Sequence, residues 1–151
     1  YRMLTTRAFP SWLYAVDLGA TTIWERWASL LAEGSVNQGE MTSFNHYAFG
    51  AVADWMHRTI GGLIPLSPAC RTVRVAPAPG AGLTSGDMRY DSPYGRIQVG
   101  WELVEHRFEL ELTVPVGVTA IVELPDGTVL SNIEHGHYVY ATDVRLETSA
   151  A

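Results

Sequence analysis

Glu25 stands between two tryptophans, Trp24 and Trp27, in the run GATTIWERW at residues 19–27. Aromatic rings stack on the apolar faces of sugars, and a carboxylate placed among them can donate or accept a proton. This combination of residue types indicates a carbohydrate site with Glu25 as its acid–base group. The spacing leaves a structural alternative open, in which Glu25 is a helix-surface glutamate paired with Arg26.

Two further features complete the candidate site. The run SFNHYAFG at residues 43–50 contributes His46, which we expect in the first turn of a helix. There His46 either helps to cap the helix or binds sugar hydroxyls, because a neutral imidazole donates one hydrogen bond and accepts another. For Trp24 and Trp27 we expect one ring in the core and at most one in the pocket.

Composition excludes several classes of function. The chain carries a net charge of −6 with only ten basic residues, which argues against nucleic acid as a partner. Its single cysteine, Cys70, excludes an internal disulfide and a cysteine-based metal cluster. The apolar runs are shorter than a membrane span, so no membrane partner is expected. His135 and His137 are a two-residue pair without a third ligand nearby, so we predict no metal and no cofactor; the cellular compartment stays unknown.

The first 65 residues have helical spacing. Ser11 and Gly19 predict the start and stop of a short helix over residues 11–18. A loop, or a short helix, then carries Glu25. Apolar residues recur at three- and four-residue intervals from Phe44 to about Ile60, which predicts a helix capped by Ser43 and ended by two glycines.

After residue 70 the pattern is that of strands. We expect at least six strands, including those at residues 72–75, 83–90, 96–104, 108–114, 119–124 and 138–144. Turn residues separate them, including Pro125-Asp126-Gly127 and the run DSPYG at residues 91–95. Six short strands predict a small antiparallel β-sandwich, so the expected fold class is α+β.

These runs resemble the end of the catalytic domain of bacterial-type α-L-rhamnosidases. The resemblance implies that residues 1–64 are the C-terminal end of a six-hairpin (α/α)6 glycosidase domain. Residues 65–151, with the runs PAPGAGLT, SPYG and VPVGVTA, resemble the β-sandwich domain that follows it. The chain opens on Tyr1 in what looks like the middle of a helix, so we expect it to be a C-terminal fragment of such an enzyme.

The family hydrolyses terminal α-L-rhamnose with inversion, using two carboxyl groups on opposite sides of the sugar. The resemblance implies that Glu25 is the general base and that His46 contacts the sugar. The general acid would lie in an earlier helix, upstream of this chain. One departure is Ala28, where the family motif often has aspartate; we expect the loss of a structural hydrogen bond. Glu40 is interpreted as a loop charge.

Two other functions remain open. The β half could be a carbohydrate-binding or purely structural module, with sugar candidates Tyr90, Tyr94, Trp101, Tyr138 and Tyr140. The parent could also be another (α/α)6 glycosidase, trehalase-like or glucoamylase-like. For the aromatic-rich helical part, the expected partner is the missing N-terminal part of the same polypeptide or a second copy of the chain. The expected substrate is a rhamnoside.

Overall fold

The computed structural model describes residues 1–144 of the chain, and the last seven residues of the predicted sandwich domain, 145–151, lie outside it. The structure divides into two compact units, Tyr1–Ala53 and a second unit from Asp54 onward. Among the described residues, no helix combines the length and the apolar character that crossing a membrane requires. The predicted domain boundary at residues 64 and 65 stays a prediction.

The first unit begins with two short helices, α1 (Arg2–Thr5) and α2 (Trp12–Asp17). The predicted N-cap of α2 is confirmed, because the Ser11 hydroxyl accepts a hydrogen bond of 3.0 Å from the backbone N–H of Tyr14. Gly19 follows the helix with φ +84°, a left-handed conformation that suits glycine after a helix C-terminus. The sequence pattern therefore located this helix correctly.

The second predicted helix begins later than expected. It consists of η1 (Ala48–Ala51), α3 (Val52–Trp55) and η2 (Met56–Ile60), followed by Gly61 as predicted. The expected start at Phe44 is wrong. The backbones of Ser43, Phe44 and His46 are hydrogen-bonded to residues 22–25, and the Ser43 hydroxyl accepts from the backbone N–H of Asn45 and not from a helical N–H.

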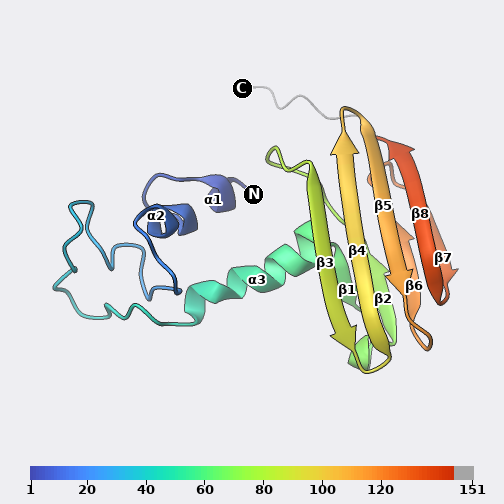
Figure 1. Cartoon of the computed structure of the whole chain (residues 1–151), viewed down its shortest axis with the longest axis horizontal. Helices are drawn as coiled ribbons and strands as arrows, with labels where there is room; N and C mark the ends of the chain where they lie inside the picture. Colours follow the sequence, from blue (N-terminus) through green and yellow to red (C-terminus); the bar gives the residue numbers. More distant parts are fainter. Residues whose placement is uncertain (145–151) are drawn as a thin grey trace. The chain divides into compact units, whose positions relative to one another are not determined.

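The second unit is a β-sandwich of two four-stranded sheets, as predicted (Figure 1). One sheet has the order β1-β2-β6-β7 and the other β3-β4-β5-β8; all pairs are antiparallel except β2 with β6. The strands are β1 (Leu63–Pro65), β2 (Thr72–Val75), β3 (Ser85–Ser92), β4 (Gly95–Val104), β5 (Arg107–Val114), β6 (Thr119–Glu123), β7 (Val129–Ile133) and β8 (Gly136–Asp143).

The core of the sandwich follows from alternation along its strands. In β5 every second side chain is buried, beginning with Phe108, and the residues between them are mainly charged and exposed. The two sheets contribute to one cluster of buried side chains, in which Phe108 and Val73 are fully buried. Trp101 stacks on Phe108 at a ring-centroid distance of 5.9 Å.

Two strands were missed in the sequence, and both lie at the edge of their sheet. β1 contains Pro65, which indicated a break, but an edge strand tolerates a residue without an N–H donor. β7 contains Ser131 and Asn132, and Asn132 has φ +59°, so the segment lacks a strand-like pattern. Edge strands need only one partner, which relaxes the constraint on their sequences.

Asp126 connects the two sheets. It lies in the β6–β7 turn, where its carboxylate accepts hydrogen bonds from the backbone N–H and the hydroxyl of Thr128. The same carboxylate accepts a hydrogen bond from the hydroxyl of Thr142, on β8 of the other sheet. The Thr142 hydroxyl, followed by the Thr128 donors, holds the pKa of Asp126 below its ordinary value.

Asp126→Asn should therefore reduce stability in a pH-dependent manner. Because the folded pKa is lowered, the carboxylate stabilises the fold above the unfolded pKa of about 3.9, and this contribution is lost as pH falls through the folded pKa. The urea midpoint of Asp126→Asn should lie below that of the wild type at about pH 7, and the gap should narrow towards about pH 2. The urea midpoint of Thr142→Val should lie below that of the wild type by a smaller amount, and this difference should also narrow as pH falls. A gap that stays constant with pH would contradict this role for Asp126.

Candidate active site

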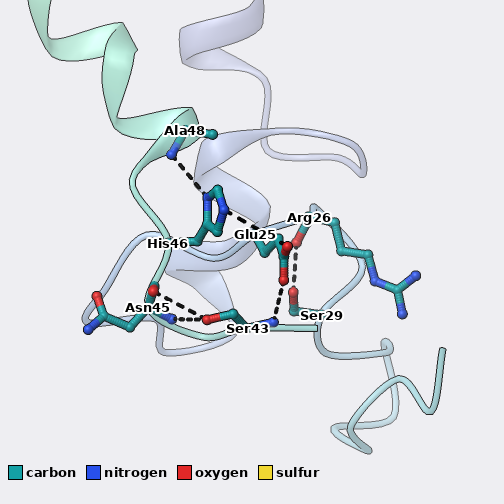
Figure 2. Close-up of polar contacts among 7 residues, drawn as sticks. All are labelled: Glu25, Arg26, Ser29, Ser43, Asn45, His46 and Ala48. Carbon is teal, nitrogen blue, oxygen red and sulfur yellow. Dashed lines mark hydrogen bonds and ion pairs between the residues drawn. The ribbon is translucent and has the colours of Figure 1, made fainter. Parts of the chain in front are cut away.

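The two chemistry-bearing runs, 19–27 and 43–50, lie side by side because their backbones pair. The N–H of Glu25 donates to the carbonyl of Ser43 at 2.9 Å, and the N–H of His46 donates to the carbonyl of Ile23 at 2.8 Å. The Thr22 hydroxyl donates to the carbonyl of Phe44. This pairing brings Glu25 and His46, separated by twenty residues of sequence, onto neighbouring irregular segments (Figure 2).

The Glu25 side chain is held by a backbone donor. The N–H of Ser43 donates to Glu25 Oε2 at 2.9 Å, which reciprocates the backbone bond between the same two residues. The side chain keeps 17% of its surface exposed, so the carboxylate is partly shielded and still reachable by water. Oε1 accepts no hydrogen bond from residues 1–144. A fixed carboxylate with one free oxygen can accept a proton.

The helix-surface interpretation of Glu25 is wrong. Glu25 lies on a loop, and the Arg26 side chain points away from its carboxylate (Figure 2). Arg26 instead donates from Nη2 to the Thr42 hydroxyl at 2.8 Å, and that hydroxyl donates to the carbonyl of Gly39 at 2.8 Å. Arg26 thus holds the 39–42 loop near the paired runs.

His46 lies two residues before the helix, so its expected place in the first turn is wrong. Its Nδ1 atom accepts a hydrogen bond of 3.2 Å from the backbone N–H of Ala48, the first helical residue. Its Nε2 atom lies 3.9 Å from Glu25 Oε1. The ring stacks on Tyr47 with centroids 5.1 Å apart. His46 therefore does cap the helix, and it also faces the carboxylate.

Trp24 and Trp27 belong to an aromatic cluster inside the first unit. Trp24 is 6% exposed and packs edge-on against Phe44 at 5.4 Å. Trp27 stacks on Phe49 at 3.9 Å and meets Trp12 edge-on at 4.9 Å. Both indoles also line a cavity of about 280 Å³ with largely apolar walls. Their contact with a sugar stays a prediction.

The other candidate residues lie outside the Glu25–His46 pair. Glu40 is exposed, as expected of a loop charge. Trp101 is 2% exposed and donates from Nε1 to the carbonyl of Ile60, so it packs in the core and is not an exposed platform for a sugar. Tyr138 and Tyr140 are half-buried and stack on each other. Within residues 1–144, no three His, Cys, Asp or Glu side chains gather as a metal site.

Sequence reasoning missed two functional groups, the backbone N–H of Ser43 and that of Ala48. The Ser43 N–H holds the Glu25 carboxylate, and the Ala48 N–H holds the His46 ring. A backbone donor is present at every residue except proline, so no residue type marks it. The Ser43 donor reaches Glu25 only because the two runs pair, and the Ala48 donor reaches His46 through a local turn before the helix.

Comparison with known proteins assigns both parts of the chain. Residues 1–60 match the family model for the bacterial alpha-L-rhamnosidase 6 hairpin glycosidase domain. Residues 62–138 match the model for the bacterial alpha-L-rhamnosidase C-terminal domain. The chain belongs to the bacterial alpha-L-rhamnosidase family. The resemblance noted in the sequence is thereby confirmed, together with the expected pair of domain types.

Individual rhamnosidases resemble the chain along almost its whole length. An alpha-L-rhamnosidase of Formosa agariphila is 36% identical over 147 residues, which are 97% of this chain and 16% of that protein. The alpha-L-rhamnosidase of Streptomyces avermitilis, solved in complex with L-rhamnose, has a TM-score of 0.88 and 34% identity over 95% of this chain and 16% of its own. The enzyme from Aspergillus terreus has a TM-score of 0.89 and 41% identity over 95% of this chain and 17% of its own. The chain thus spans about one sixth of these relatives.

Proposed function

We propose that the chain supplies the general-base side of an inverting α-L-rhamnosidase that removes terminal α-L-rhamnose from rhamnosides. The observation that carries the proposal is the Glu25 carboxylate, fixed through Oε2 by the Ser43 N–H and open at Oε1. Membership of the rhamnosidase family supports the choice of sugar. Because the chain spans about 16% of a relative, we propose that the general acid lies on residues outside this sequence.

In the proposed reaction Glu25 Oε1 accepts a proton from water as the water oxygen bonds to the anomeric carbon. The bond from that carbon to the aglycone oxygen breaks, and its electron pair leaves with the oxygen. The general acid protonates this oxygen from the opposite side of the sugar, roughly 6.5–9.5 Å from the base. Attack and departure on opposite faces convert the α configuration into β.

The remaining roles follow from the same resemblance. We propose that His46 contacts the substrate and that Trp24 and Trp27 shape the apolar wall beneath it. We also propose that the partner of the aromatic residues 1–53 is the preceding part of the same polypeptide. Pairing of this unit with a second copy of the chain stays a prediction without a supporting contact.

The complete polypeptide should hydrolyse an aryl α-L-rhamnoside and release β-L-rhamnose as the first product. Proton NMR recorded before the anomers equilibrate measures this configuration directly. The matched aryl α-glucoside should be a poor substrate, which separates a rhamnosidase from a trehalase-like or glucoamylase-like enzyme. Initial release of α-L-rhamnose, or preference for the glucoside, would rule out the proposed function.

A further inference from the structure

The hydrogen atom of the His46 ring can be placed from its surroundings. A backbone N–H only donates, so Nδ1, which faces the Ala48 N–H at 3.2 Å, must be the accepting nitrogen. In a neutral imidazole the other nitrogen then carries the hydrogen. The contact with Ala48 thus selects the Nε2–H form of His46, and stacking on Tyr47 fixes the plane of the ring.

This form leaves His46 with a single hydrogen-bonding group for a ligand. Nδ1 is used by Ala48, so the ring offers one donor, Nε2–H, and no acceptor. That donor lies beside Glu25 Oε1, at 3.9 Å, which is too long for a direct hydrogen bond. One oxygen atom of a ligand or water fits between His46 Nε2 and Glu25 Oε1, about 2.8 Å from each, with an angle of about 90° at that oxygen.

Glu25 indicates which oxygen this is. Its Oε2 atom accepts from Ser43, so Oε1 is the atom left to take a proton from the attacking water. A water bound to Oε1 has its own lone pair within reach of the neighbouring Nε2–H. We infer that His46, held in its Nε2–H form by the Ala48 N–H, orients the attacking water together with Glu25. This inference rests on the proposed function, in which Glu25 is the base.

Two substitutions in the complete enzyme distinguish the roles of the two ring nitrogens of His46. In His46→Gln the side-chain amide can place a donor near the position of Nε2, facing Glu25. In His46→Asn the shorter amide can accept from the Ala48 N–H, as Nδ1 does, but presents no donor to Glu25. With an aryl α-L-rhamnoside we expect kcat of His46→Asn to fall at least about tenfold, the scale of one lost hydrogen bond, and kcat of His46→Gln to fall less, because it keeps a donor that faces Glu25.

The control is the thermal midpoint: His46→Asn, which keeps an acceptor for the Ala48 N–H, should unfold near the wild-type midpoint, so that a fall in its kcat does not reflect a loss of the fold. The inference is overturned if His46→Asn keeps the wild-type kcat, or if both variants lose kcat equally. A rise in KM alone would assign the Nε2–H donor to the sugar, as in the proposed function, and would also overturn the inference. Loss of activity in Glu25→Gln with no kcat effect in His46→Asn would remove this inference and leave the proposed function standing.

Discussion

Replacing Glu25 with glutamine in the complete enzyme should lower kcat by about 10²- to 10⁴-fold, the usual contribution of a general acid or base. The glutamine carbonyl can still accept the Ser43 N–H, so the side chain keeps its position and loses only its capacity to take a proton. KM for an aryl α-L-rhamnoside should change little, because binding of the sugar does not need that proton transfer. Steady-state kinetics with the released phenol as the signal measure both constants.

Glu40→Gln is the matched control for this prediction. Glu40 carries the same functional group on the loop that Arg26 holds near the site, but its side chain is exposed to solvent. Its loss should leave both kinetic constants unchanged. If Glu25→Gln lost less than about tenfold in kcat, or if Glu40→Gln lost as much, Glu25 would not be the base.

Phe108→Ala should destabilise the sandwich by about 3–5 kcal/mol, the typical cost of truncating a buried phenylalanine. Phe108 is fully buried on β5 and stacks on Trp101, so the truncation removes apolar contacts and leaves a cavity between the sheets. The stability of a whole domain is about 5–15 kcal/mol, which makes this loss a large part of it. Urea unfolding of the 151-residue chain, followed by tryptophan fluorescence, measures the change.

Val104→Ala on β4 is the control for the core. Val104 is 66% exposed, so its truncation should change the free energy of unfolding by no more than about 0.5 kcal/mol. If Phe108→Ala and Val104→Ala lowered the free energy of unfolding equally, the stability of the sandwich would not depend on the burial of these side chains.

The sandwich was predictable from local patterns because each central strand has its own signal. β5 alternates buried and exposed residues, and the turn at Gly127, with φ +90°, has the residues that such a turn needs. β1 and β7 were not predictable, since a short edge strand with proline or asparagine resembles a loop. The parallel pairing of β2 with β6 joins strands far apart in sequence, and no local pattern carries that information.

The candidate site was predictable in its residues but not in its geometry. Glu25 and His46 stand out by type and by the family resemblance, whereas their contact depends on backbone pairing between two irregular runs. The same pairing explains the error at the start of the helix, because residues from Phe44 onward had a suitable apolar spacing but bonded to another segment. Tertiary hydrogen bonds thus overrode a local helical preference.

Azide rescue of Glu25→Ala shows whether Glu25 is the base of an inverting reaction. With 4-nitrophenyl α-L-rhamnoside, azide needs no base: its nitrogen bonds to the anomeric carbon while the nitrophenolate leaves with the electron pair of the broken bond. If Glu25 is the base, azide restores nitrophenolate release by Glu25→Ala, and NMR identifies the product as β-L-rhamnosyl azide. An azide product of α configuration, or no azide product with the activity still lost, would contradict this role for Glu25.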